Sequence, residues 1–167
     1  MKFSTRRIYS LLACFALFFF GISLLLQYQF GLMPCSLCLI ARSIMLLTGI
    51  LFTIAAFHNP VEGIAKLIYP ISSSILIALG LSVTARHIWI LQLPPHLVPS
   101  CTPGLDYLFE TLPMFEAILV VLKGAGECAE SQEQFLGFSL PLWTMLAFIL
   151  LGLGSIWAYF QTKKRVA

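Results

Sequence analysis

Four long apolar runs, separated by more polar segments, dominate the pattern of the sequence. They cover roughly residues 9–27, 37–57, 67–92 and 142–160. At 1.5 Å of rise per residue, about 20 helical residues cross the roughly 30 Å hydrocarbon core of a bilayer. Because backbone polar groups in lipid must be bonded within the protein, runs this long are expected as helices rather than as barrel strands. The pattern therefore predicts an all-α membrane protein, a four-transmembrane-helix bundle that forms a single domain over residues 1–167.

A fifth apolar run is too short to cross the membrane. Residues 114–122 are apolar, Pro113 suits the first turn of a helix, and Gly124 suits its end. We expect a short interfacial helix here, within the long segment 93–141.

Composition supports lipid as the solvent of the four long runs. The chain is 59% hydrophobic and 10% charged, whereas soluble domains carry about a quarter charged residues. A cleaved signal peptide is the alternative for the first run, since Lys2, Arg6 and Arg7 precede it. That run is longer than the apolar region of a signal peptide, and more leucines follow the small residues of Gly21-Ile22-Ser23. We expect it to stay as an anchor.

Charges predict which side of the membrane each loop occupies. Seven of the ten basic residues lie in the two termini or in loop 58–66, namely Lys2, Arg6, Arg7, Lys66, Lys163, Lys164 and Arg165. The positive-inside rule makes that side cytoplasmic and places loops 28–36 and 93–141 outside. Six of the seven acidic residues lie in the long outer loop, namely Asp106, Glu110, Glu116, Glu127, Glu130 and Glu133. This charge would repel nucleic acid.

Four of the five cysteines fall at the side predicted to lie outside, namely Cys35, Cys38, Cys101 and Cys128. Only Cys14 lies within a span, where we expect a small apolar packing residue. Disulfides persist outside the cytoplasm, so the four outer cysteines are candidates for bonding. Position alone leaves their connectivity open, because four cysteines allow three pairings.

The segment Cys35-Ser36-Leu37-Cys38 is a C-x-x-C motif, a spacing typical of redox-active thiol pairs. Half of a zinc site is an alternative, but Cys101 and Cys128 do not form the second C-x-x-C that would complete it. A c-type haem would need a histidine where Leu39 stands. A purely structural bond between neighbours this close would remove little entropy from the unfolded chain. These comparisons favour redox chemistry.

Cys101 and Cys128 admit two interpretations. A bond between them would stabilise the long loop by about 3 kcal/mol through chain entropy, so a structural disulfide is a strong alternative. Pro99, Pro103 and Gly104 surround Cys101, and such residues suit exposed segments that a partner protein can reach.

Charged residues near the outer ends of two spans are candidates for a binding site. Arg42 follows Cys38 by one helical turn, on the same face and about 6 Å deeper. Arg86 and His87 lie near the outer end of the third span. Ionisable residues in a membrane mark functional sites unless they snorkel to the surface, which is the alternative for Arg86. Such groups can bind the carbonyl oxygens of a lipid-soluble quinone and stabilise the charge it gains.

Taken together, these motifs resemble the disulfide bond formation protein B (DsbB) family over nearly the whole chain. The matching segments are Pro34-Cys35-Ser36-Leu37-Cys38 with Arg42, Arg86-His87-Ile88-Trp89, Leu93-Pro94, Pro99-Ser100-Cys101, Gly126-Glu127-Cys128-Ala129-Glu130, Phe135-Leu136-Gly137 and Leu140-Pro141-Leu142-Trp143. The resemblance implies a bundle in the bacterial inner membrane that binds ubiquinone or menaquinone. It also implies an oxidoreductase that reoxidises a periplasmic thioredoxin-like thiol oxidase of the DsbA type, and so supports disulfide formation in periplasmic proteins.

The resemblance also implies roles for individual residues. Cys35 and Cys38 resemble the redox-active disulfide in electronic contact with the quinone, and Cys101 and Cys128 resemble the disulfide that exchanges with the partner. Arg42 looks like the quinone-site arginine, and His87 is similar in position to a quinone-proximal histidine.

Two other functions stay open at this point. One is a paralogous oxidoreductase of the same architecture that serves a dedicated substrate. The other is a non-enzymatic membrane protein, such as a transporter subunit, with two structural disulfides. Transporters commonly carry internal repeats and helices broken near the midplane, and neither feature stands out in the sequence.

Overall fold

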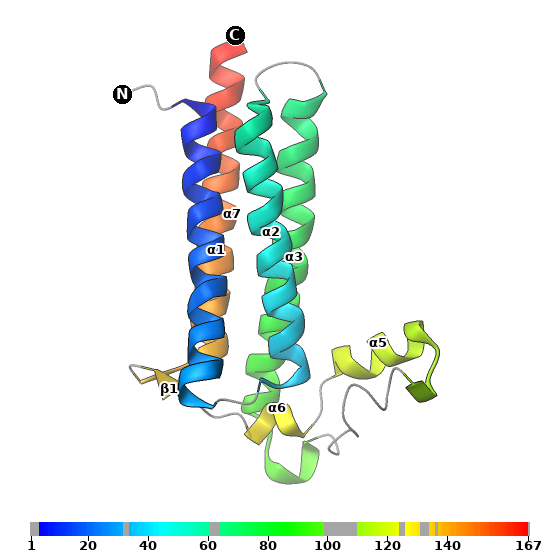
Figure 1. Cartoon of the computed structure of the whole chain (residues 1–167). Coiled ribbons are helices and arrows are strands. Elements are labelled where there is room, and N and C mark those ends of the chain that lie inside the picture. Colours follow the sequence, from blue (N-terminus) through cyan, green and yellow to red (C-terminus); the bar gives the residue numbers. More distant parts are fainter. Residues whose placement is uncertain are drawn as a thin grey trace.

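The computed structural model describes residues 4–31, 34–60, 64–98, 110–123, 126–130, 134–135 and 137–166. Four long helices form its body (Figure 1), namely α1 (Thr5–Phe30), α2 (Ser36–His58), α3 (Ala65–Leu91) and α7 (Leu140–Val166). Each contains a stretch long and apolar enough to cross a membrane, namely Thr5–Gln29, Ser36–His58, Ala65–Leu91 and Leu140–Thr162. The predicted four-helix membrane architecture is confirmed.

The helices extend beyond some of the apolar runs that predicted them. The first run was expected over roughly 9–27, yet α1 begins at Thr5 and continues to Phe30. It ends where Gly31 takes a left-handed conformation with φ 64°, which glycine adopts without strain. Hydropathy detects only the part of a helix that suits hydrocarbon, so it misses polar turns at the ends.

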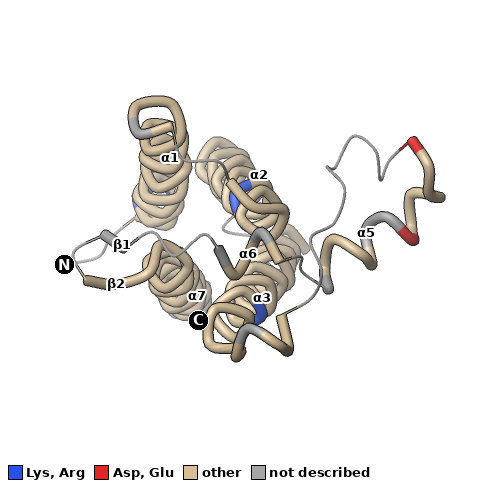
Figure 2. The backbone as a smooth tube through the Cα atoms, turned by 90° about the horizontal axis from the view of Figure 1, so that it is seen from below, with Lys and Arg blue, Asp and Glu red and all other residues tan. Residues whose placement is uncertain are grey.

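The four helices form a ring in the order α1, α2, α3, α7. Helix α1 packs against α2 and α7, and α3 packs against the same two neighbours, as the view along the bundle shows (Figure 2). The start of α1, the end of α2, the start of α3 and the end of α7 lie at one end of the bundle, which we call the terminal end (Figure 1). The start of α2, which carries the C-x-x-C motif, and the end of α3 lie at the opposite end, which we call the cysteine end.

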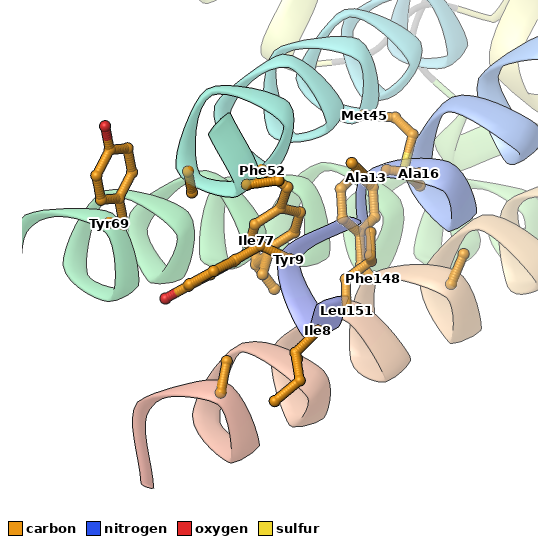
Figure 3. Close-up of a cluster of buried hydrophobic side chains, with 14 residues drawn as sticks. Ile8, Tyr9, Ala13, Ala16, Met45, Phe52, Tyr69, Ile77, Phe148 and Leu151 are labelled. Atoms are coloured by element: carbon orange, nitrogen blue, oxygen red, sulfur yellow. The ribbon is translucent and has the colours of Figure 1, made fainter. Parts of the chain in front are cut away.

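Large apolar side chains from all four helices fill the middle of the bundle (Figure 3). Tyr9, Phe52, Phe148 and Leu151 are almost completely buried there. Gly80 allows α3 and α7 to approach closely, because a Cβ at this position would lie 2.5 Å from the Phe148 ring. Small residues at helix contacts are the usual means of tight packing in lipid.

Two polar contacts join helices within the terminal half of the bundle. The Ser73 and Ser155 hydroxyls lie 2.7 Å apart and connect α3 to α7. The His58 Nδ1 atom and the Tyr69 hydroxyl are also 2.7 Å apart and connect α2 to α3. Hydrogen bonding satisfies these polar groups where water is absent.

Short elements at the other end connect α3 to α7. They are η1 (Pro95–Leu97), α5 (Met114–Lys123), α6 (Glu127–Glu130), and a hairpin of β1 (Gln134–Phe135) and β2 (Phe138–Ser139). The expected short helix is present as α5, which extends away from the bundle (Figure 1). It exposes Met114 and Phe115 and buries Val121. Its location at the membrane surface stays a prediction.

One packing expectation is wrong. Cys14 is exposed on α1, so it faces outward from the bundle instead of filling its interior. The apolar run has no clear polar stripe, so hydropathy could not show which face of α1 meets its neighbours.

Candidate active site

The C-x-x-C motif forms the first turn of α2. Cys35 is the N-cap residue with an extended backbone, and α2 begins at Ser36. The Leu39 amide donates to the Cys35 carbonyl at 3.1 Å, which closes the turn. Cys35 and Cys38 are thiols here, with their Sγ atoms 3.2 Å apart. This separation is short enough for a disulfide to form with little side-chain movement.

His87, in the last turns of α3, lies against both thiols. Its Nε2 atom is 3.7 Å from Cys35 Sγ, and its Nδ1 atom is 3.7 Å from Cys38 Sγ. The Nε2 atom also donates to the Cys128 backbone carbonyl at 3.3 Å. Only 3% of His87 is exposed. The residue that the resemblance associates with a quinone therefore contacts the C-x-x-C sulfurs directly.

Helix α6 brings Cys128 to the same cluster. This helix packs against α2 and α3, which completely buries Cys128. The Cys128 Sγ atom lies 3.8 Å from the Ser36 hydroxyl, within the C-x-x-C segment itself. One cysteine of the long loop is therefore a neighbour of the motif, although Cys128 and Ser36 are 92 positions apart in the sequence. Cys101 lies outside the described residues.

Arg42 connects α2 to α1. Its guanidinium group donates to the Gln27 side-chain oxygen and, at 3.1 Å, to the Ser23 backbone carbonyl. Its Nε atom is buried and has no hydrogen-bond partner among the residues that the structure describes. The sequence analysis missed Gln27, although a polar side chain near the end of an apolar run was an available signal.

Arg86 and His87 are adjacent in sequence, but their side chains lie in different surroundings. The guanidinium carbon of Arg86 lies 4.9 Å from the centroid of the Trp89 ring, a cation–π contact along the same helix. Trp89 is largely exposed, so this contact lies on the outer surface of the bundle. The arrangement agrees with the anchor interpretation of Arg86.

Cys35, Cys38 and His87 each offer one atom that could bind a metal ion, and these three atoms all lie within 4.8 Å of one another. Thiolate sulfur and imidazole nitrogen are the ligands that zinc prefers. The sequence analysis looked for further metal ligands among the outer cysteines, whereas the third candidate ligand comes from α3. The cluster can therefore undergo thiol chemistry or hold a soft metal ion.

Comparison with known proteins decides the family. A family model described as "Disulfide bond formation protein DsbB" matches residues 5–158. The chain belongs to the DsbB family. A relative named disulfide bond formation protein B from Chromohalobacter salexigens is 47% identical over 131 residues, which cover 78% of this chain and 76% of the relative. A relative of the same name from Acinetobacter baumannii is 39% identical and covers 96% of this chain and 94% of its own length. No solved structure matches the chain.

Membership of the DsbB family confirms the resemblance inferred from the motifs. It identifies a multi-pass membrane protein with an oxidoreductase role in disulfide bond formation. The matched region, 5–158, contains Arg42, His87 and the four cysteines Cys35, Cys38, Cys101 and Cys128. A transporter subunit with structural disulfides does not fit this family.

Proposed function

We propose that the chain is a protein dithiol:quinone oxidoreductase. It reoxidises a periplasmic thioredoxin-like thiol oxidase of the DsbA type and passes the electrons to ubiquinone or menaquinone in the membrane. The observation that carries this proposal is the buried cluster at the start of α2. There, His87 contacts both C-x-x-C sulfurs and the Cys128 backbone at 3.3 to 3.7 Å.

The first step is thiol–disulfide exchange with the partner. A partner thiolate attacks a disulfide between Cys101 and Cys128 at the Cys101 sulfur, which forms a mixed disulfide and releases the Cys128 thiolate. The second partner thiol then attacks the mixed disulfide and releases Cys101. The partner leaves with a new disulfide, and its two electrons remain on Cys101 and Cys128 as two thiols.

The second step moves this electron pair within the chain. Cys101 and Cys128 form what we call the outer pair. A thiolate of this pair attacks a Cys35–Cys38 disulfide and forms a disulfide with one of these two cysteines. The second thiol of the outer pair then attacks that bond and resolves it. Cys101 and Cys128 are oxidised again while Cys35 and Cys38 become thiols. The position of Cys128 beside Ser36 supports this exchange, because the Cys128 sulfur needs no large domain movement to reach the motif.

The third step returns Cys35 and Cys38 to the disulfide. When bound, the quinone supplies the oxidising power by accepting two electrons and two protons. Arg42 suits a quinone site because its buried Nε atom has a hydrogen to donate and no acceptor among the described residues. Gln27 and Ser23 hold the guanidinium group in place. His87 donates its Nε2 proton to the Cys128 carbonyl, so its Nδ1 atom is placed to take one proton from the Cys38 thiol as the pair is oxidised.

Cys38 and Cys35 differ in their access to a membrane-soluble oxidant. Cys35 is 4% exposed, whereas Cys38 is only partly buried. Cys38 is also closer along α2 to Arg42, which follows it by one turn. We infer that Cys38 is the thiol that faces the quinone, and that the bond between Cys35 and Cys38 forms as their two electrons pass to the bound quinone.

We also infer the orientation in the inner membrane. The termini and loop 58–66 would lie in the cytoplasm, and the cysteine end in the periplasm, because basic residues gather in the former segments. A C-terminal fusion to a fluorescent protein that folds only in the cytoplasm would then fluoresce. A C-terminal alkaline phosphatase fusion, active only in the periplasm, would be inactive. The reverse pattern would contradict this orientation.

The reaction itself is tested by stoichiometry. Purified full-length protein is mixed anaerobically with an excess of a reduced DsbA-type oxidase and a soluble ubiquinone analogue. Quinone absorbance and partner thiols are followed together. We expect one quinone reduced for each partner disulfide formed, at a rate proportional to the protein added. Partner oxidation without quinone reduction, or no reaction with either ubiquinone or menaquinone analogues, would refute the proposal.

A further inference from the structure

The reduced cluster has nearly the dimensions of a zinc site. Tetrahedral zinc binds sulfur at about 2.3 Å and nitrogen at about 2.0–2.1 Å, which places two sulfurs roughly 3.8 Å apart and a sulfur and a nitrogen roughly 3.5 Å apart. The sulfurs of Cys35 and Cys38 are 3.2 Å apart, the Cys38 sulfur is 3.7 Å from His87 Nδ1, and the possible ligand atoms of the three residues all lie within 4.8 Å of one another. Small side-chain movements would therefore suffice to admit an ion.

The orientation of His87 also suits a metal ligand. The Cys128 carbonyl can only accept a hydrogen bond, so the Nε2 atom that lies 3.3 Å away carries the ring proton. The Nδ1 atom then keeps its lone pair, and it faces Cys38 Sγ at 3.7 Å. Histidines that bind metals commonly donate their other ring N–H to a carbonyl in this way, which fixes the tautomer and the ring orientation.

We propose that Cys35, Cys38 and His87 form a binding site for a zinc-class ion, Zn²⁺ or Cd²⁺, when the C-x-x-C pair is reduced. The two thiols bind as thiolates and release two protons, and the fourth coordination position is left to water or an added ligand. No electrons move in this step. Both sulfurs become metal ligands, so the pair cannot form a disulfide until the ion leaves. The same three side chains would thus make the reduced protein sensitive to reversible inhibition by metal.

Cadmium titration tests this site without quinone or partner. Full-length protein in detergent is reduced, freed of reductant under anaerobic conditions and titrated with CdCl₂ while the ultraviolet absorbance of cadmium–thiolate bonds is recorded. We expect one ion per chain in reduced protein and none after the C-x-x-C pair is oxidised. Equal binding by both forms would overturn the proposal. Because this titration includes no electron acceptor, its failure would leave the proposed quinone reaction untouched.

Variants separate the proposed ligands from other thiols. His87→Ala removes a proposed ligand. It should therefore weaken cadmium binding by more than the roughly 10- to 100-fold loss that is typical when only a residue hydrogen-bonded to a ligand is removed. Cys14→Ser removes an exposed thiol on α1 and should leave the affinity unchanged. Cys101→Ser should also retain one bound ion. If Cys101→Ser abolished binding while His87→Ala preserved it, the ion would belong to Cys101 and Cys128, and the proposed site would be wrong.

A protection experiment on the unsubstituted protein avoids the question of whether variants fold. Reduced protein is alkylated with a maleimide in the presence or absence of Cd²⁺, and the modified cysteines are identified by mass spectrometry. We expect the ion to protect Cys35 and Cys38 together, and a chelator to restore their alkylation. Equal alkylation of both cysteines with and without the ion would overturn the site.

Discussion

The two ends of the bundle are held together by different kinds of contact. Toward the terminal end, large apolar side chains such as Tyr9 and Phe52 interlock, and the Ser73–Ser155 hydrogen bond joins two helices. At the cysteine end, the close contacts join reactive atoms, namely two sulfurs, an imidazole and a backbone carbonyl. We infer that the first region maintains the fold and that the second carries the chemistry on that scaffold. Substitutions in the two regions should therefore have separable effects.

The largest effect is expected at the C-x-x-C pair. Cys38→Ser should abolish quinone reduction, because a serine oxygen cannot form the disulfide that stores and releases two electrons. Unfolding of the bundle, followed by circular dichroism in increasing sodium dodecyl sulfate, should remain close to that of the unsubstituted protein, since Cys38 is partly exposed and lies at a helix start. Measurable quinone reduction by this variant would contradict the inference that the cysteine end of the bundle carries the chemistry.

Arg42 and Gln27 should give graded effects on quinone use. Loss of a hydrogen bond from a charged group costs about 1.5–3 kcal/mol, so Arg42→Met should raise the KM for a soluble quinone by roughly 10- to 150-fold. Gln27→Leu should raise it by only a few fold, because Ser23 still accepts from the guanidinium group.

Both variants are assayed at saturating partner. The KM for the partner should stay unchanged, which distinguishes a quinone-site role from general damage to the cluster. A larger effect from Gln27→Leu than from Arg42→Met would contradict the role of Gln27 as a residue that positions Arg42.

Overpacking at Gly80 should affect stability and spare the chemistry. A Cβ there would lie 2.5 Å from the Phe148 ring, and extra atoms in a packed core typically cost about 1–3 kcal/mol. Gly80→Ala should therefore unfold at a lower dodecyl sulfate fraction, while the molecules that remain folded keep their quinone reductase activity. Gly21→Ala is the matched control, because a Cβ at Gly21 would meet nothing within 4 Å. Equal destabilisation by both variants would contradict the close approach of α3 and α7.

The smallest effect is expected at the buried serine pair. Ser155→Ala should reduce stability by about 0.6 kcal/mol, the average worth of an interhelical hydrogen bond in a membrane protein. The loss is modest because the Ser73 hydroxyl still donates to the Pro70 carbonyl at 3.0 Å. Ser82→Ala serves as the control, since Ser82 is exposed and its hydroxyl donates to the Ala78 carbonyl of the same helix. No difference between the two variants would show that the Ser73–Ser155 contact contributes nothing measurable.

Much of the architecture was predictable because lipid imposes a simple rule on the sequence. A helix that crosses hydrocarbon must be predominantly apolar over about 20 residues, so the four spans appear directly as runs. The C-x-x-C motif was equally visible, since both cysteines are local and the first turn of α2 brings their sulfurs together. Hydropathy could not place Cys14, because an apolar run shows no difference between faces that meet helices and faces that meet lipid.

The assembly of the cluster depends on contacts between elements far apart in the chain. Arg86 and His87 are adjacent in sequence, and only the packing of α3 against α2 determines that His87 meets the thiols. Cys128 reaches Ser36 because α6 folds back over the helix ends, which no local pattern encodes. Gln27 becomes relevant only when α1 lies beside α2. Motifs thus identified the candidate site residues, and tertiary packing determined which of them lie in contact.

A bypass experiment tests the two-stage relay most directly. Quinone reduction is measured anaerobically with either a reduced DsbA-type oxidase or dithiothreitol as the electron donor, after subtraction of the protein-free rate. Cys101→Ser should fail with the protein donor and recover with dithiothreitol, because the small dithiol can reduce a Cys35–Cys38 disulfide without the outer pair. Cys38→Ser should be inactive with both donors, whereas Cys14→Ser should be active with both. Activity of Cys38→Ser with dithiothreitol, or of Cys101→Ser with the protein donor, would contradict the relay.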